Sequence, residues 1–299
     1  MQGIPRYVLI TPARNEAAFI ELTIRSVVAQ TVPPIKWAIV SDGSTDGTDE
    51  IVRKYAAAHD WIELVRLPEH NERNFAAKVT AFNAGLTRMN QNHVNYDVIG
   101  SLDGDLSFDS DYFSFLLSKM AENPRLGLVG TPFAEDGVTY DYRFASVEHV
   151  SGACQLFRRE CFEAIGGYLP MKSGGIDTVA VLSARLKGWQ TRTFPEKVSN
   201  HHRSQGTASR NGLALTFHTG RKDYVLGVDP IWQLLRAAYR IVKTPYVIGG
   251  VALFIGYLWP LLLGMPRTAP EEIIAFRRQD QRARLRILLR RFCVPWPGR

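Results

Sequence analysis

Cysteine is scarce in this chain of 299 residues. Its three cysteines, Cys154, Cys161 and Cys293, are too few and too irregularly spaced for a disulfide framework or a zinc site. We therefore expect them to be small core residues in a reducing environment. The sequence also contains no internal repeat and no low-complexity segment. A signal peptide is not expected, because an apolar strand pattern begins at Tyr7.

Acidic residues are scarce towards the C-terminus. The net charge is +7, and the segment from Met265 onward supplies most of it, with arginines far outnumbering acids. A helix predicted over 271–292 pairs those arginines with apolar side chains such as Leu285 and Ile287, which is typical of a helix lying on anionic lipid. A solvated basic face is the plainer alternative, and a nucleic-acid patch is less favoured.

Charge of either sign is missing from Tyr246 to Gly264. This run is about as long as a membrane span, and aromatic residues such as Trp259 suit an interfacial position. Both flanks are basic, however, and internal glycines and Pro260 would break a straight helix. We therefore expect a re-entrant or interfacial segment with both ends on the cytoplasmic side of a membrane. A buried core helix is the alternative.

Strand and helix patterns alternate through the first half of the chain. Strands are predicted over 7–11, 37–41, 62–67 and 96–102, followed later by 126–130 and 155–159. Helices are predicted from about residue 15, after residue 46, and over 78–90, 109–123 and 178–187. This order indicates an α/β fold with a mostly parallel sheet covered by helices on both faces. Ligands of such sheets bind beyond the carboxyl ends of the strands.

Two aspartates end the fourth predicted strand, in the sequence Asp103-Gly104-Asp105. Paired carboxylates repel each other, and a divalent cation carrying a phosphorylated ligand would compensate them. An ordinary acidic turn is the alternative, because Asp-Gly is a common turn dipeptide.

Small and acidic residues also follow the first two predicted strands. Pro12, Ala13 and Glu16 follow the first, and Asp42 begins an Asp-Gly-Ser stretch after the second. Free backbone N–H groups at such helix starts can receive a phosphate, and Asp42 can accept from a base N–H. Each segment taken singly is also consistent with a helix cap.

Together, in this order and spacing, the segments resemble the glycosyltransferase family 2 pattern on the GT-A fold, over roughly residues 5–205. The resemblance implies a Rossmann-like sheet flanked by helices and a Mg²⁺ or Mn²⁺ cofactor. It also implies nucleotide or donor contacts at Pro12, Ala13, Glu16, Asp42, Lys78, Asp103 and Gly152. Asp105 would hold the metal. One of the two adjacent histidines would complete the metal shell, and we assign this role to His202. A plainer alternative stays open for several of these residues: Lys78 as an exposed lysine, Gly152 as a turn glycine and the histidines as polar loop residues.

The family often carries a Glu-Asp pair where a helix opens after a glycine. Here Ile176 stands in place of the glutamate and Asp177 keeps the aspartate, so the resemblance implies Asp177 as the base that deprotonates an acceptor hydroxyl. A helix N-cap is the alternative for Asp177. A second departure is Ser41, which replaces the first acid of the usual Asp-Asp-Gly-Ser stretch. Residues 205–210 do not supply the Gln-x-x-Arg-Trp motif of processive synthases, which favours single-sugar addition.

We therefore expect a catalytic domain over 1–225 and a membrane-associated helical region with a basic tail over 226–299. The expected activity is inverting transfer of one sugar from a nucleotide-diphosphate sugar to a lipid-linked or glycan acceptor, with no nucleic-acid partner. The expected location is the cytoplasmic side of the cell membrane. A nucleotidyltransferase on a similar sheet is the alternative, as is a non-catalytic lipid- or nucleic-acid-binding module with a degenerate site.

Overall fold

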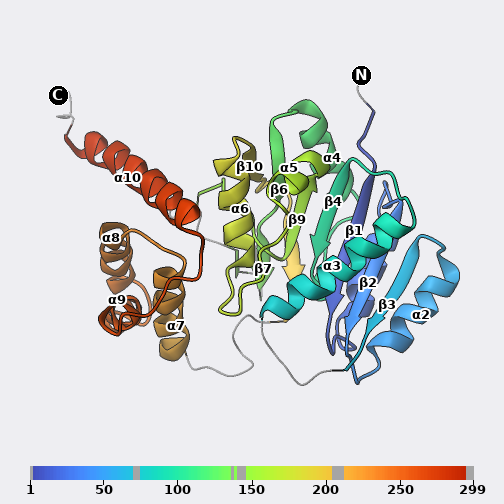
Figure 1. The fold of residues 1–299 in the computed structure, drawn as a ribbon, viewed down its shortest axis with the longest axis horizontal. Coiled ribbons are helices and arrows are strands. Elements are labelled where there is room, and N and C mark those ends of the chain that lie inside the picture. The colour runs from blue at the N-terminus through green and yellow to red at the C-terminus, as the bar shows by residue number, and fades with distance from the viewer. Residues whose placement is uncertain (1–2, 70–74, 136–137, 140–145, 204–211, 294–299) are drawn as a thin grey trace. The chain divides into compact units, whose positions relative to one another are not determined.

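The computed structural model describes residues 3–69, 75–135, 138–139, 146–203 and 212–293. It divides into two compact units, residues 1–204 and 205–299, which we describe separately (Figure 1). By this division helix α7 (Gly212–Val225) belongs to the second unit, whereas the predicted catalytic domain of 1–225 would include it. The domain boundary after residue 225 stays a prediction.

A sheet of seven strands, counted over the described residues, forms the centre of the first unit. Its strands are β1 (Tyr7–Ala13), β2 (Lys36–Asp42), β3 (Ile62–Leu67), β4 (Val98–Leu102), β6 (Leu126–Gly130), β9 (Cys154–Arg158) and β10 (Gln190–Thr193). The strand order is β10-β6-β9-β4-β1-β2-β3. Strand β9 runs antiparallel to β4 and β6, and the other pairs are parallel. The predicted mostly parallel α/β sheet is confirmed.

Helices cover both faces of this sheet, as alternation of side chains along its strands requires. They are α1 (Ile20–Val28), α2 (Thr48–Ala58), α3 (Phe75–Gln91), α4 (Tyr112–Glu122), α5 (Arg159–Ala164) and α6 (Ile176–Leu186). Leu9 and Trp37 belong to a buried cluster shared with α1, α2 and α4. Their neighbours Ile10 and Val40 face α3, which approaches them closely at Gly85. Figure 1 shows α3 lying across the sheet.

Helix α1 begins at Ile20, later than predicted. Asn15 adopts a positive φ of 55°, and the N–H of Phe19 donates to the carbonyl of Glu16 in a tight turn. A left-handed residue cannot lie inside a right-handed helix. The segment from Asn15 to Phe19 therefore forms a loop at the carboxyl end of β1, where it can contact a ligand.

A second, smaller sheet was not predicted. Its strands are β5 (Leu106–Ser107), β7 (Phe133–Glu135), β8 (Val138–Thr139) and β11 (Ser199–His201), in the order β5-β11-β7-β8. The strands have two or three residues each, which is too short for a periodic pattern to be visible in the sequence. Because His201 pairs with Leu106, the small sheet brings the end of β11 beside Asp105.

The second unit consists of helices. They are α7 (Gly212–Val225), α8 (Pro230–Ile241), α9 (Ile248–Leu262) and α10 (Glu271–Cys293). Helices α7 and α9 cross at backbone contact, because a Cβ on Gly220 would lie 2.0 Å from the carbonyl oxygen of Leu253. A Cβ on Gly256 would lie 2.0 Å from the carbonyl oxygen of Phe217. Only glycine permits so close a crossing.

The uncharged run is mostly helix α9. This helix has 15 residues, or roughly 22 Å at the rise of an α-helix, against about 30 Å for a hydrocarbon core. Within the described ranges, no helix combines the length and the apolar character needed to cross a membrane. One face of α9, including Leu253 and Tyr257, is buried in the unit, and the opposite face is exposed.

Candidate active site

A pocket of roughly 630 Å³ lies beyond the carboxyl ends of β1, β2 and β4 in the first unit. Its lining residues are Pro12, Ala13, Arg14, Asn15, Glu16, Asp42, Ala77, Lys78, Ala81, Asp103, Gly104, Asp105, Lys172 and Arg203. Seven residues assigned to the site above line it: Pro12, Ala13, Glu16, Asp42, Lys78, Asp103 and Asp105. Gly152, Asp177 and His202 do not. Three basic lining residues, Arg14, Lys172 and Arg203, were not predicted.

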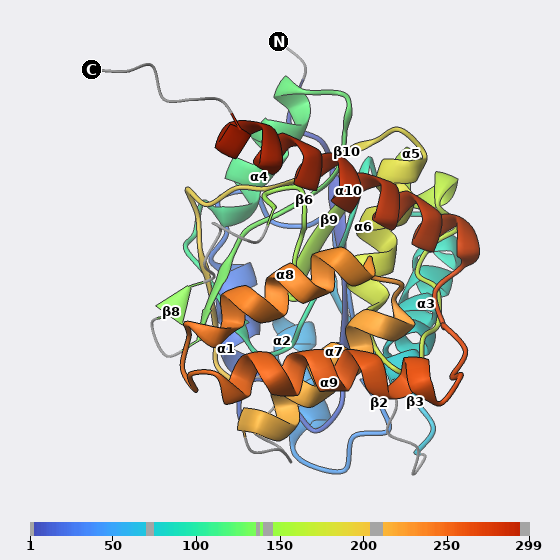
Figure 2. The same cartoon turned by 90° about the vertical axis from the view of Figure 1, so that its left-hand side faces the viewer.

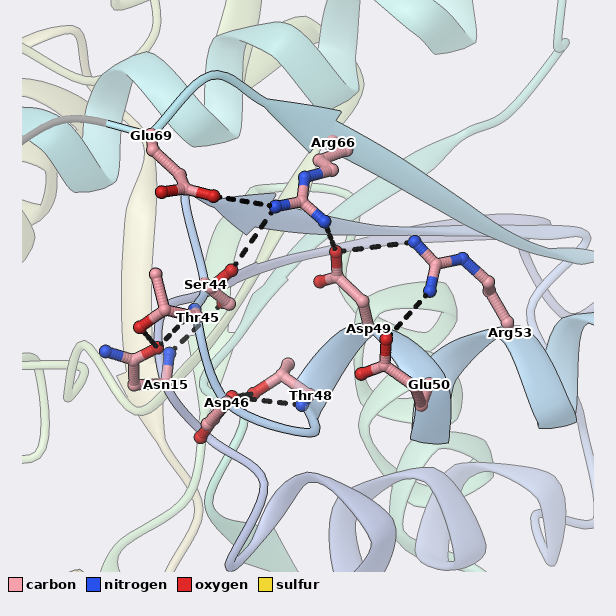
Figure 3. Close-up of polar contacts among 10 residues, drawn as sticks. All are labelled: Asn15, Ser44, Thr45, Asp46, Thr48, Asp49, Glu50, Arg53, Arg66 and Glu69. Carbon is pink, nitrogen blue, oxygen red and sulfur yellow. Dashed lines mark hydrogen bonds and ion pairs between the residues drawn. The ribbon is translucent and has the colours of Figure 1, made fainter.

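The loops after β1 and β2 are tied together by side chains from both motifs (Figure 3). The carboxamide oxygen of Asn15 accepts from the N–H of Thr45 at 2.8 Å, and the N–H of Asn15 donates to Ser44 Oγ at 3.2 Å. The N–H of Glu16 donates to Thr48 Oγ1 at 2.8 Å. The two motifs, distant in sequence, therefore form one wall of the pocket.

An ion-pair network supports this wall from behind (Figure 3). Arg66 at the end of β3 lies 2.6 Å from Asp49, which is almost fully buried at the start of α2. Arg66 also donates to the carbonyl of Ser44 at 3.5 Å and lies 3.2 Å from Glu69. Because Arg66 contacts both the helix start and the loop, it fixes the Asp-Gly-Ser stretch relative to β3.

Asp42 ends β2 at the pocket wall. Its side chain is 9% exposed, and Oδ2 lies 4.0 Å from Nη1 of Arg14. The carboxylate therefore lies beside a cation at the pocket wall, and a carboxylate oxygen is a hydrogen-bond acceptor.

Asp103, Asp105 and His201 converge where the two sheets meet. One potential ligand atom from each lies within 4.8 Å of the others. Nε2 of His201 is 3.5 Å from Oδ1 of Asp105, and Nδ1 is 3.2 Å from Oε1 of Glu135. Nδ1 makes no hydrogen bond to the described residues, but a carboxylate lies beside it, as one commonly does beside metal-binding histidines.

The cluster fits a divalent cation. Oδ1 of Asp105 is buried and has no hydrogen-bond partner among the described residues. Burial, followed by the neighbouring charge of Asp103, raises the pKa of Asp105. Two carboxylates and an imidazole form a donor set that binds Mn²⁺ or Mg²⁺, and a cation there would offset the cost of burying Asp105 as an anion.

His201 takes the place in the cluster that was predicted for His202. Nε2 of His202 lies 2.8 Å from Ser107 Oγ, and its exposed ring stacks on Phe19 at a centroid distance of 6.5 Å. Successive residues of a strand point to opposite sides, so one of the two adjacent histidines faces the acids and the other faces away. The small sheet decides which one does.

Lys78 on α3 contacts the first acid of the pair. Its Nζ makes a short hydrogen bond to Oδ1 of Asp103 and lies 3.5 Å from the carbonyl oxygen of Gly152. Burial lowers the pKa of Lys78, but the charge and hydrogen bond of Asp103 outweigh it, so the net pKa is raised. Lys78 is thus a fixed cation at the pocket, and the free exposed lysine considered above is wrong.

Asp177 lies against Gly152 at the start of α6. The N-cap of α6 is Gly175, so the alternative in which Asp177 caps the helix is wrong. A Cβ built on Gly152 would lie 3.0 Å from Cβ of Asp177 and 3.4 Å from its Oδ2. The carboxylate therefore stands over Gly152, whose carbonyl oxygen faces Lys78. Although it does not line the pocket, Asp177 is connected to it through these two residues.

Of the basic lining residues that were not predicted, Arg203 makes contacts with two of the predicted acids. Its Nη2 lies 2.6 Å from Oε2 of Glu16 and donates to the carbonyl of Asn15 at 3.3 Å. Its Nε lies 3.9 Å from Oδ2 of Asp105. Burial raises the pKa of Glu16 to about 7, against the opposing effect of Arg203. The position directly after the histidine pair was the available signal.

Fold and site together define an α/β protein with a pocket beyond the strand ends and, beside it, a cluster of two acids and a histidine that could hold a cation. The model of the family described as "Glycosyl transferase family 2" matches residues 8–174. The chain belongs to this family.

Curated relatives match over less than half of the chain. A poly-beta-1,6-N-acetyl-D-glucosamine synthase of Staphylococcus epidermidis is 27% identical over 138 residues, 46% of this chain and 31% of the relative. The corresponding synthase of Staphylococcus aureus strain COL is 28% identical over the same length. The match thus spans less than a third of either relative.

Solved structures share the GT-A-like fold. A mannosyltransferase from Pyrobaculum calidifontis, in complex with GDP-Man and Mn²⁺, aligns with a TM-score of 0.58 and 18% identity, covering 96% of this chain and 81% of that one. S. aureus TarS 1-349 in complex with UDP-GlcNAc gives a TM-score of 0.52 and 13% identity, covering 85% and 71%. At these identities the likeness concerns the fold.

Proposed function

We propose that this chain is a metal-dependent, inverting glycosyltransferase that moves one sugar from a nucleotide-diphosphate sugar to an acceptor hydroxyl. The observation that carries the proposal is the convergence of Asp103, Asp105 and His201 at the edge of a pocket built from the β1, β2 and β4 strand ends. A bare acidic turn would not need an inward-facing histidine and a buried carboxylate oxygen that accepts no hydrogen bond from the described residues.

On the donor side, Asp42 would receive the base, and the wall formed by the β1 and β2 loops would hold the nucleoside. Arg203 and Lys78 would stand beside the diphosphate, because both lie within reach of the acid pair. A Mg²⁺ or Mn²⁺ ion on Asp105 and His201 would neutralise the charge that builds up on the departing nucleoside diphosphate. Asp103, held by Lys78, would face the ribose or the donor sugar.

On the acceptor side, Asp177 would remove the proton from the attacking hydroxyl. A base across the sugar from the leaving group permits in-line displacement, which inverts the configuration at the anomeric carbon. Because Gly152 has no side chain, the carboxylate of Asp177 can lie close to the backbone beside the pocket.

The candidate nucleotides come from the structural neighbours, and the candidate acceptors come from the character of the second unit. Complexes of the structural neighbours contain GDP-Man or UDP-GlcNAc, so both guanosine and uridine donors are candidates here. A lipid-linked or glycan acceptor at the cytoplasmic face of a membrane is consistent with the apolar second unit. The stretch 205–210, which favours single-sugar addition, lies outside the described residues.

Sugar transfer by three variants of the full chain tests the proposal. With UDP- and GDP-sugars, Mn²⁺ and an acceptor extract, Asp105→Asn and Asp177→Asn should each lower nucleoside-diphosphate release by at least 100-fold. Asp109→Asn, an exposed acid beside Lys197, is the matched control and should keep full activity. Wild-type rates in both site variants would overturn the assignment. Release of pyrophosphate in a second assay, supplied with a nucleoside triphosphate and a sugar 1-phosphate, would indicate a nucleotidyltransferase.

A further inference from the structure

The second unit exposes apolar side chains in two regular stripes, one on each of two neighbouring helices. On α8 the stripe consists of Ile231, Leu234, Leu235, Ile241 and Val242. On α9 it consists of Ile248, Val251, Ile255, Trp259 and Leu262. Within each helix these residues recur at helical spacing, so each stripe is one continuous face. Helices α8 and α9 pack against each other, and Figure 2 shows them side by side.

Helix α8 places apolar side chains outward and a polar side chain inward, which is the reverse of a helix at a water-exposed surface. Its inward face buries Gln233, whose two amide atoms have no hydrogen-bond partner among the described residues. Its outward face leaves Leu234 and Leu235 each about half exposed. Water would favour the opposite arrangement, because exposed apolar area costs free energy and a buried amide needs partners. The outward faces of both helices are therefore suited to an apolar environment.

Charge and aromatic residues indicate which apolar environment this is. Between Pro230 and Gly264 the only charged side chains are Arg236, Arg240 and Lys243, and there is no acid. Trp259 is 51% exposed and lies within the stripe, as an aromatic ring at a membrane interface would. Basic side chains around an apolar face complement an anionic bilayer, where the apolar residues enter the acyl boundary.

The arginines of α10, which the sequence analysis placed on lipid, are partly used inside the unit. Arg277 and Arg278 donate to the carbonyls of Leu226 and Gly227 at the end of α7. Arg282 lies 2.7 Å from Asp229. These three cations are engaged with protein groups and are not available as a free basic face.

We propose that the outward stripes of α8 and α9 form the surface by which this protein binds an anionic lipid bilayer, with both helices lying in the interface. The inference deepens the membrane location of the proposed function by naming the surface. Neither helix crosses the bilayer, and the stripes enter the boundary between headgroups and acyl chains while Lys243 remains at headgroup level. Arg236 is paired with Asp223 at 2.7 Å inside the unit.

Vesicle binding by the full chain tests this surface. Wild-type protein should co-sediment with vesicles of 70% phosphatidylcholine and 30% phosphatidylglycerol, and less with phosphatidylcholine alone. The double variant Leu235→Asp/Ile255→Asp should lower the partition coefficient at least tenfold. Leu22→Asp/Ile35→Asp, at apolar residues of the first unit with similar exposure (41% and 40%), should bind as wild type does.

A second readout does not depend on the folding of the double variant. Lipids brominated in their acyl chains should quench wild-type tryptophan fluorescence, and Trp259→Phe should remove most of that quenching. Equal binding by both double variants, or quenching unchanged by Trp259→Phe, would overturn the proposal. So would a wild-type dimer without vesicle binding that Leu235→Asp/Ile255→Asp converts to monomer, because the face would then be a contact between copies.

Nucleotide binding separates this inference from the proposed function. Stabilisation of the double variant by UDP or GDP with Mn²⁺, measured as a shift in the thermal unfolding midpoint, should equal that of the wild type. Loss of vesicle binding by the double variant, with an unchanged nucleotide-dependent shift in its unfolding midpoint, supports the proposed lipid-binding surface. Vesicle binding by a wild-type protein that shows no nucleotide-dependent shift would leave the surface standing and overturn the proposed donor site instead.

Discussion

The guanidinium of Arg203 lies 2.6 Å from Oε2 of Glu16 and so joins the end of β11 to the loop after β1. Its Nε is also 3.9 Å from Asp105. Arg203 thus contacts one residue of the pocket wall formed by the β1 and β2 loops and one residue of the Asp103–Asp105–His201 cluster. A diphosphate bound between wall and cluster would present anionic oxygens to the same guanidinium, which suits them geometrically.

Replacing Arg203 by alanine should weaken nucleoside-diphosphate binding. Loss of a hydrogen bond to a charged group costs about 1.5–3 kcal/mol, or roughly 10- to 100-fold in affinity. Titration calorimetry with UDP and GDP in the presence of Mn²⁺ measures the change. Arg203→Lys should recover part of the affinity, because it restores the charge without the planar fork.

Arg159→Ala is the control for that experiment. Arg159 is a partly exposed arginine that pairs with Glu163 at 2.8 Å on α5, and it does not line the pocket. Its removal should leave nucleotide affinity unchanged. An affinity unchanged in Arg203→Ala as well would mean that the Arg203–Glu16 pair only holds the loops together.

The adjacent histidines provide a matched pair for the metal site. His201→Ala should lower Mn²⁺ affinity at least tenfold, because it removes a potential ligand that faces both Asp105 and Glu135. His202→Ala removes a ring that contacts Ser107 and Phe19, and Mn²⁺ affinity should stay within a factor of two or so of wild type. Electron paramagnetic resonance of free Mn²⁺ measures both. The opposite ranking would restore the original prediction of His202.

The large sheet could be predicted from the sequence because its signals are local. The runs at 7–10 and 37–40 are apolar along their whole length and buried, and parallel strands buried on both faces have that composition. The acidic and small residues follow these runs, so their convergence at one sheet edge follows from topology. Six of the seven predicted residues that line the pocket do so for this reason, and the seventh, Lys78, reaches it from α3.

The positions of His201 beside the acid pair and of Arg203 could not be predicted in the same way. They depend on β11 pairing with β5 and β7, which lie far from it in sequence and have two or three residues each. Nothing in a three-residue strand fixes which face is buried, so His201 and His202 were equivalent in the sequence. The outward orientation of the apolar face of α8 could not be predicted for a different reason. In the sequence an apolar stripe of this kind is indistinguishable from one that faces a core, and only the packing shows its direction.

Gly152 and Asp177 yield a prediction about catalysis as distinct from binding. In Gly152→Ala the new Cβ would lie 3.0 Å from Cβ of Asp177, so the aspartate must shift by a few tenths of an ångström. Small displacements of a catalytic group are costly, and we expect kcat to fall roughly tenfold. The KM for the nucleotide sugar should change little.

The control for this variant is Gly212→Ala, where the new Cβ would meet nothing within 4 Å. Steady-state kinetics of both variants, with the donor varied at saturating acceptor, separates the two parameters. A rise in donor KM at constant kcat would place Gly152 at the donor sugar instead of beside the base.

Asp229 is the most deeply buried charged residue of the second unit. Its Oδ1 caps α8 by accepting from the N–H of Ile231 at 2.9 Å, and its Oδ2 lies 2.7 Å from Nε of Arg282. Burial acts to raise the pKa of Asp229, but the hydrogen bonds from Arg282 and the helix N–H groups outweigh it, and the net pKa is lowered. A carboxyl group whose folded pKa lies below its unfolded value stabilises the fold when ionised.

The contribution of Asp229 should therefore be complete above the unfolded pKa of about 3.9 and should disappear as the pH falls through the lower folded value. Asp229→Asn keeps a capping side chain but loses the charge, and it should destabilise the second unit by about 1–2 kcal/mol at pH 6, a modest value because Arg282 is half exposed. Urea unfolding followed by circular dichroism at pH 6 and pH 3 measures this. The difference between variant and wild type should shrink towards zero at pH 3. Asp280→Asn removes a pair with Arg284 within α10 and should cost less than half as much at pH 6. A difference for Asp229→Asn that is equal at both pH values would show that its carboxylate stabilises the unit by shape and not by charge.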